Sequence, residues 1–135
     1  MMNFPVVVHK DPDSAYGVTI PDLPGCFSAG DTLDEALENT KEAIECHIEG
    51  LLMDEVPLPI PQAIEKHYQN SDYSDGIWES VCVDISKISG NLKPIEVTLP
   101  EKILIQLDKY AKKNGDTRSS LLVQATIEYL SVHAQ

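Results

Sequence analysis

The sequence predicts an α+β protein built from two parts, a β-β-β-α-β domain and a smaller strand-helix-helix tail. One observation is a long amphipathic pattern over residues 32–52, which predicts a helix with one apolar face. A second is the set of short valine-rich stretches around this helix, which alternate and end at turn residues as antiparallel strands do. A third is the net charge, which changes sign between residues 1–92 and residues 93–135.

Length and composition fit one ordinary domain or two small ones. The chain has 135 residues, of which 42% are hydrophobic and 24% are charged. No apolar run approaches the roughly 20 residues that cross a bilayer. The opening stretch MMNFPVVVHK has no basic segment ahead of its apolar residues. We therefore expect a cytoplasmic protein that makes no contact with a membrane.

The first two strands form a hairpin that leads into a rigid elbow. FPVVVH at 4–9 predicts a strand, and YGVTI at 16–20 predicts its antiparallel return. In the elbow, PDLPGCFSAGDT at 21–32, the prolines end the second strand because they cannot donate to a sheet. Gly25 can adopt turn angles closed to other residues, and residues 26–29 are long enough for a short third strand.

The helix over residues 32–52 is the clearest element. Thr32 is a good N-cap, and Glu35 three residues later completes a capping box. The apolar face repeats at positions 33, 36, 37, 43, 44, 48, 51 and 52. The opposite face is acidic. The elbow thus stops a strand, reverses the chain and begins a helix that lies across the sheet.

The rest of the first domain is less regular. VPLPIPQ at 56–62 predicts an extended segment, residues 63–68 a short helix and residues 70–76 a loop. IWESVCVDI at 77–85 predicts the last strand. We therefore place the first domain at residues 1–85, with its helix on an antiparallel sheet, and a linker at residues 86–92.

The tail, residues 93–135, begins a second pattern. IEVTL at 95–99 alternates, Pro100 stands where a first helical residue belongs, and Asn114 with Gly115 ends that helix. A second helix runs from 118 to about 133. Segments of this size rarely hold a core alone, and a single strand leaves its backbone groups unpaired. We therefore predict a homodimer in which two strands pair antiparallel and the helices interlock.

Both parts resemble known families. KPIEVTLPEKILIQLDKYAKKNGDTRSSLLVQATIEYL resembles the ribbon-helix-helix fold. PDLPGC at 21–26, GDTLDEAL at 30–37, Glu42-Ala43 and PLPIP resemble the HicB antitoxin family. That resemblance implies a degraded ribonuclease-H-like fold for residues 1–85 and a partner toxin, HicA, which is a small basic ribonuclease. It implies no enzyme activity, no catalytic residues and no cofactor in this chain.

The ribbon-helix-helix resemblance also implies operator DNA as a partner. Paired strands of this fold enter the major groove, and the apolar parity of 95, 97 and 99 leaves the other parity for DNA. Family members often carry an amide at position 96 and a basic residue at 94, so this sequence departs from the pattern. Backbone N–H groups at the start of the second helix would hold a phosphate. The expected DNA-binding residues are Lys93, Pro94, Glu96, Thr98, Thr117, Arg118 and Ser119.

Charge indicates a different partner for the first domain. Residues 1–92 hold four lysines against 17 acidic residues, a net charge of −13, whereas residues 93–135 carry +1. Such an acidic surface repels phosphate and attracts a basic protein, although an acidic helix face is also ordinary solvated surface. An aromatic residue on an edge strand is a further candidate contact. The candidate toxin-binding residues are Asp34, Glu38, Glu42, Glu45 and Trp78.

Other site chemistry finds little support in the sequence. Asp11, Asp13, Asp22 and Asp31 invite a metal-nuclease interpretation, but three of them stand in turn or cap contexts where aspartate has a structural use. We therefore expect no metal site. The three cysteines lie far apart with no CxxC, which predicts buried free thiols.

We interpret the chain as an antitoxin that binds and occludes a basic ribonuclease toxin and represses its own operon. Dimerisation through the tail gives two toxin-binding arms, so we expect larger assemblies with toxin. The alternative is a ribbon-helix-helix regulator whose first domain senses a small ligand and has no toxin partner.

Overall fold

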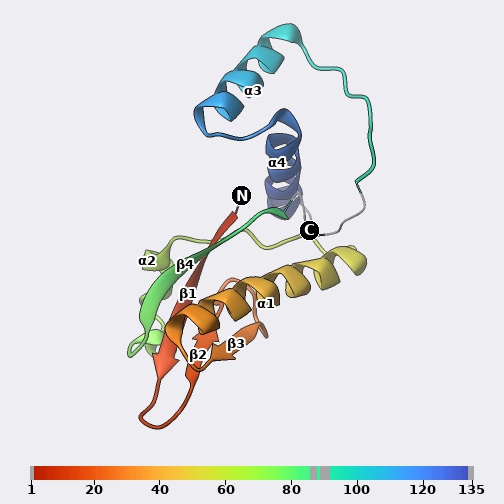
Figure 1. Cartoon of the computed structure of the whole chain (residues 1–135). Helices are drawn as coiled ribbons and strands as arrows, with labels where there is room; N and C mark the ends of the chain where they lie inside the picture. Colours follow the sequence, from red (N-terminus) through yellow and green to blue (C-terminus); the bar gives the residue numbers. More distant parts are fainter. Residues whose placement is uncertain (1, 86–87, 89–91, 134–135) are drawn as a thin grey trace.

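A computed structural model describes residues 2–85, 88 and 92–133. One long helix, α1 (Leu33–Met53), lies across a four-stranded antiparallel sheet of order β3-β2-β1-β4 (Figure 1). The strands are β1 (Met2–Lys10), β2 (Tyr16–Thr19), β3 (Phe27–Gly30) and β4 (Ile77–Val83). The predicted α+β class and the β-β-β-α-β order are confirmed. The short helix α2 (Ile64–His67) and the 3₁₀ turn η1 (Ser71–Tyr73) lie between α1 and β4.

β1 is central and is covered on both faces. Phe4, Val6 and Val8 belong to the same buried cluster as Ile44 and Ile48 of α1. Val7, of the opposite parity, is also fully buried. A Cβ atom built on Gly76 would lie 2.1 Å from Val7 Cγ2, so the chain just before β4 covers this second face. Burial on both faces explains why β1 is a nearly continuous apolar run.

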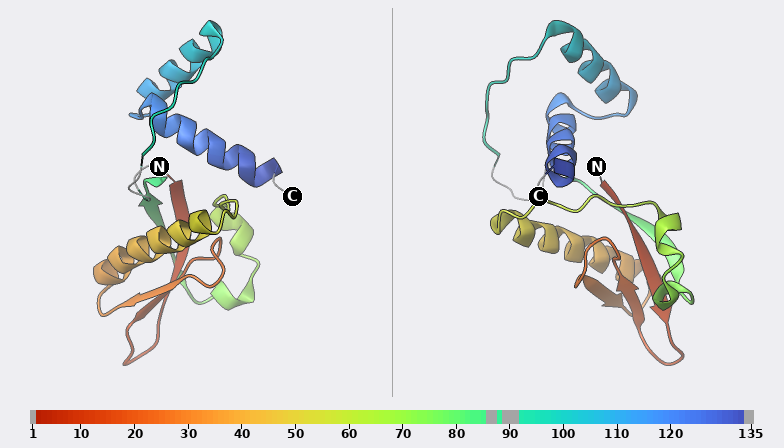
Figure 2. Two further views of the ribbon diagram at one scale, coloured as in Figure 1. Left: turned by 90° about the vertical axis from the view of Figure 1, so that its right-hand side faces the viewer. Right: turned by 180° about the vertical axis from the view of Figure 1, so that it is seen from behind.

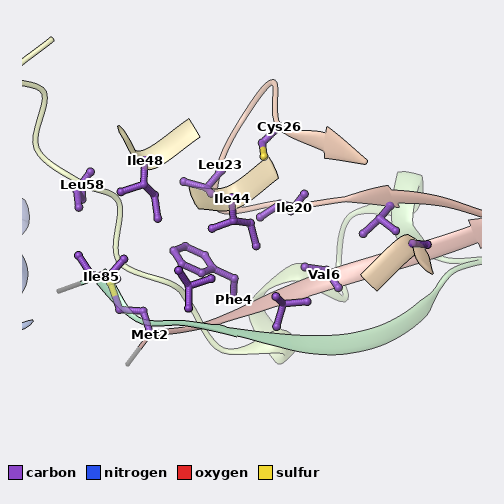
Figure 3. Packing of buried hydrophobic residues seen from close by; sticks show 14 of the residues in the cluster. Met2, Phe4, Val6, Ile20, Leu23, Cys26, Ile44, Ile48, Leu58 and Ile85 are labelled. Atoms are coloured by element: carbon purple, nitrogen blue, oxygen red, sulfur yellow. The ribbon is translucent and has the colours of Figure 1, made fainter. Parts of the chain in front are cut away.

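The core lies between the sheet and α1. Figure 3 shows Phe4 of β1 pointing toward Ile44 of α1 and Leu23 of the elbow. Among the described residues, Thr40 is the one polar residue buried over its backbone and side chain together, and its hydroxyl donates to the Ala36 carbonyl at 2.6 Å. That bond satisfies the hydroxyl without interrupting the apolar face.

The elbow is closed by its own backbone. The N–H of Leu23 donates to the Ile20 carbonyl and the N–H of Cys26 donates to the Leu23 carbonyl, both at 3.0 Å. Gly25 adopts a φ of +86°, which other residues rarely adopt. This turn places Leu23, 1% exposed, in the core. α1 then begins as predicted, since the Thr32 hydroxyl accepts from the Glu35 N–H at 3.1 Å.

The tail forms two helices, α3 (Glu101–Lys113) and α4 (Arg118–His133), at the predicted positions. Pro100 was expected as the first helical residue and is instead the extended N-cap, with ψ at 138°. Residues 92–100 form no strand in this single chain, which offers them no ladder partner. Ile95 and Val97 are therefore exposed, by 74% and 56%.

α4 also contacts the first domain. Val123 and Ile127 pack against the buried cluster of the sheet and α1. Near the end of α4, the Ser131 hydroxyl donates to the carbonyl of Leu58, a buried residue of the proline-rich segment. Figure 2 shows α4 beside the end of the sheet where β1 begins. The sequence interpretation, which gave all of α4 to a separate tail, did not foresee this contact.

The three cysteines differ in exposure. Cys26 is buried, but Cys46 and Cys82 are exposed, so the prediction of buried thiols is wrong for both. Cys82 alternates on β4 with the buried Val81 and Val83 and thus faces outward.

The predicted linker at 86–92 lies almost entirely outside the described residues. Over the described part of the chain, no helix has the length and apolar character to cross a membrane.

Candidate functional site

The elbow carries a buried carboxylate. Asp22 has a side chain only 4% exposed, and its Oδ1 atom lies 3.2 Å from Nε2 of His67 in α2. Its Oδ2 atom is buried and has no hydrogen-bond partner within the described residues. Buried polar atoms nearly always have a partner, so this oxygen is a position that a donor from outside the chain could satisfy.

An aromatic cluster extends from His67 to the edge strand β4. The His67 ring stacks on Trp78 with centroids 6.0 Å apart and an interplanar angle of 16°. Tyr68 and Tyr73 each meet Trp78 edge-on at 5.8 Å. Tyr68 remains 60% exposed. Aromatic residues of this kind are common at the centres of protein interfaces.

A cleft of about 460 Å³ opens beside Asp22 and His67. The elbow contributes Asp22, the proline-rich segment contributes Leu58 and Ile60, α2 contributes His67, and α4 contributes Ser131. The remaining lining residues are Pro21, Pro24, Pro57, Pro59 and Gln62. Asp22 is the one carboxylate of this lining, which has no lysine or arginine. The cleft therefore combines apolar side chains with the polar groups of Gln62, His67 and Ser131 and a single buried acid.

The five candidate toxin-binding residues do not form one surface. Asp34, Glu38 and Glu42 are exposed along α1, and Glu45 of the same face is half-buried. Trp78 pairs directly with Val7, and directly opposed residues share a face of a sheet. Val7 and Trp78 thus lie on the face away from α1. The structure separates the acidic helix face from the aromatic cluster by the whole sheet.

The candidate DNA-binding residues fall in two exposed places. Lys93, Pro94, Glu96 and Thr98 lie in the extended segment before α3, and residues 117–119 lie at the start of α4. The Thr117 hydroxyl accepts from the Ser120 N–H at 3.1 Å, which confirms the predicted cap.

The Arg118 side chain is already engaged within the tail. Its Nε and Nη2 atoms donate to the two carboxylate oxygens of Asp108 at 3.0 and 2.9 Å. These hydrogen bonds, with the charge of the guanidinium, hold the pKa of Asp108 below its usual value and raise that of Arg118. The side chain of Arg118 thus ties α4 to α3.

The acidic residues do not converge on a metal site in the described part of the chain. Across residues 2–85, 88 and 92–133, no three His, Cys, Asp or Glu side chains converge as metal ligands. Asp11, Asp13 and Asp31 are exposed, whereas Asp22 is turned into the interior. Burial raises the pKa of the Cys26 thiol, and the neighbouring Cys46 adds a smaller effect in the same direction. A raised pKa makes Cys26 a poor nucleophile.

Sequence reasoning missed His67 and Ser131. His67 follows Asp22 by 45 positions, and Ser131 follows Leu58 by 73. No local pattern reports such contacts. The one available signal was the proline spacing on both sides of the cleft, in PDLP and PLPIP, which indicated two rigid segments but not that they meet.

Comparison with known proteins gives a consistent result. A family model described as HicB-like antitoxin of bacterial toxin-antitoxin system matches residues 4–126. A 14.9 kDa protein from the rep-hol intergenic region of Haemophilus phage HP1 is 41% identical over 133 residues, which are 96% of this chain and 99% of that protein.

Solved structures agree with the sequence matches. The crystal structure of the antitoxin HicB from Burkholderia pseudomallei superposes with a TM-score of 0.86 at 38% identity, covering 96% of this chain and 99% of that one. A chain from a HicA3 and HicB3 toxin-antitoxin complex superposes with a TM-score of 0.54 at 30% identity, covering 62% of this chain and 99% of that chain.

Proposed function

This chain belongs to the HicB-like antitoxin family of bacterial toxin–antitoxin systems, and from that premise we propose that it binds and occludes a HicA-type ribonuclease toxin. Proteins of this family are regulatory antitoxins and not enzymes. In the proposed mechanism the first domain covers the RNA-binding surface of the toxin. Inhibition then needs shape and charge complementarity, with no chemical step by this chain.

The observation that carries this proposal is the similarity to a chain of the HicA3 and HicB3 complex. The similarity covers 62% of this chain, close to the share that residues 1–85 make up, and 99% of that chain. It supports the view that a part of this chain about as large as the first domain can take part in a toxin complex. The net charge of −13 over residues 1–92 suits a basic partner and would speed its association.

The experiment is co-purification with the product of the adjacent gene, which we expect to be a small basic protein, followed by a ribonuclease assay of that protein with and without this chain. We expect a complex and loss of cleavage. The double variant Glu38→Lys with Glu42→Lys should slow association about tenfold at low salt. Glu101→Lys with Glu128→Lys, in the exposed tail, makes the same charge change and should leave the rate within about twofold. Unimpeded cleavage in the presence of wild-type chain would refute the proposal.

The tail, residues 93–135, is proposed to dimerise as a ribbon-helix-helix module and to repress its own operon. Support comes from the exposed apolar residues of its segment 92–100 and of α3, including Ile95, Val97 and Ile103. Exposed apolar surface of this extent needs a cover, and a second copy supplies both a ladder partner and a core. Binding to operator DNA is tested by a gel-shift titration at several salt concentrations.

A regulator that senses a small ligand is the second candidate function. The cleft of about 460 Å³ favours it, because this volume falls within the range of small-molecule pockets. A chain that neither forms a complex with the adjacent basic protein nor inhibits it, but changes its DNA affinity with a neutral metabolite, would support this candidate.

A further inference from the structure

We propose that the cleft beside Asp22 is the receptor for one cationic side chain, an arginine or a lysine, of the bound toxin. The proposal rests on the proposed function and names a contact within it. The site lies away from the acidic face of α1, so it would be a second and more specific anchor than general charge attraction.

The chemistry of Asp22 selects a cation. Its Oδ1 atom contacts His67, and its Oδ2 atom has no partner among the described residues although it is buried. A buried carboxylate oxygen without a donor is costly, and a charged donor recovers more of that cost than a neutral one. Anions are disfavoured, because Asp22 supplies a carboxylate and the described residues of the lining include no lysine or arginine.

The shape of the cleft selects a long side chain. Because only 4% of the Asp22 side chain is exposed, a narrow group reaches it more readily than a bulky one. The walls are proline rings together with Leu58 and Ile60. Arginine and lysine carry methylene stems that pack on such apolar walls while the charged end reaches the acid.

The cleft also joins the two parts of the chain. Ser131 of α4 lines the cleft, and its hydroxyl donates a hydrogen bond to the carbonyl of Leu58, a lining residue from the proline-rich segment. An inserted side chain would therefore touch the elbow, the proline-rich segment and the tail helix together. Because the lining comes from both parts of the chain, we assign the cleft to a side chain of a partner protein that contacts both parts.

The first test uses the full chain and L-argininamide as the probe, with the single tryptophan, Trp78, as reporter because His67 stacks on it. We expect a saturable change in Trp78 fluorescence with wild type. Asp22→Asn should lower the apparent affinity for L-argininamide at least tenfold. Asn keeps an oxygen for His67, and circular dichroism checks that the variant is folded. Asp13→Asn, an exposed turn residue outside the cleft, is the matched control and should bind like wild type. Gln62→Lys, at the exposed lip, puts a fixed cation beside the cleft and should weaken the probe without touching the core.

No saturable change in wild type, or equal affinity in wild type and Asp22→Asn, would overturn the proposal. Equal binding of L-citrullinamide, which keeps the α-amino group but has a neutral ureido side chain of nearly the same shape, would also overturn it, because the guanidinium charge would then not be recognised. Calorimetry with the toxin separates this inference from the proposed function. Toxin that binds wild type and Asp22→Asn equally leaves the antitoxin function intact and removes the cleft from it. Toxin that does not bind wild type refutes the function itself.

Discussion

The Oδ1 atom of Asp22 lies 3.2 Å from Nε2 of His67, a contact that joins the elbow to α2. Both side chains are largely buried, at 4% and 15% exposed. The contact holds the His67 ring against Trp78 and closes one side of the cleft. One hydrogen-bonded pair thus connects the aromatic cluster, the cleft and the turn between β2 and β3.

Replacing His67 with alanine tests this role. The change leaves the Asp22 carboxylate with no partner among the described residues, so we expect the free energy of unfolding to fall by about 1–3 kcal/mol. Urea unfolding followed by Trp78 emission measures it, and the native emission should shift to longer wavelength as the ring loses its cover. His133→Ala, an exposed residue at the end of α4, should change neither quantity. An equal loss in both variants would contradict the role.

A second prediction compares two glycines. A Cβ atom on Gly30 would lie 2.4 Å from the backbone nitrogen of Ala36, where α1 begins against β3. Gly30→Ala should therefore lower the free energy of unfolding by about 1–3 kcal/mol. Gly50, within α1, has no atom within 4 Å of its Cβ position, so Gly50→Ala should raise stability by about 0.5–1 kcal/mol. Thermal melts decide: a gain in stability for Gly30→Ala would show that the backbone yields at residue 30, and a loss for Gly50→Ala would contradict the prediction for that position.

Local rules were sufficient for most of the first domain. Thr32 and the apolar repeat fixed α1 to within one residue, and the proline-rich elbow was correctly predicted to end one strand and begin a helix. These signals work because hydrogen bonds and side-chain spacing within a helix or turn involve residues only three or four positions apart. Pro100 was misplaced by one position, because proline is tolerated both at the N-cap and at the first helical position and helix ends are uncertain by a residue.

Long-range contacts were beyond such rules. Nothing near Asp22 in the sequence indicates His67, and although α4 is apolar on more than one side, its pattern does not indicate that Val123 and Ile127 pack on the first domain. Cys46 is a different case: cysteine is usually buried, but position 46 lies off the apolar face of α1, so the helical pattern and not the residue type indicated its exposure. The candidate site is therefore mostly a product of tertiary packing.

Thiol reactivity should distinguish the three cysteines. Cys46 and Cys82 are exposed and should react quickly with a disulfide reagent, whereas Cys26, buried with its thiol 3.7 Å from the Ala43 carbonyl, should react at least about tenfold more slowly. Mass spectrometry of partly labelled protein identifies each site. Rapid labelling of Cys26 in folded protein would mean that the elbow opens.

The raised pKa of Cys26 also predicts a pH dependence. The folded state holds the thiol proton more tightly than the unfolded state, so this group contributes stability below its ordinary pKa of 9.0 and loses that contribution as pH rises beyond it. Wild type should therefore lose more stability between pH 8 and pH 10 than Cys26→Ala does. Parallel slopes for the two proteins would show that Cys26 plays no part.

The last prediction concerns parity in the segment before α3. Val97 and Thr98 are adjacent and exposed in the single chain, so aspartate at either position disturbs little within one copy. If two copies pair their segments with Val97 facing the shared core, Val97→Asp places a charge in that core and should give a monomer at micromolar concentration by light scattering. Thr98→Asp should stay dimeric but weaken operator binding about tenfold or more, because its carboxylate faces the phosphates. A dimeric Val97→Asp variant beside a monomeric Thr98→Asp variant would reverse the predicted register, and two dimeric variants would place the subunit contact outside this segment.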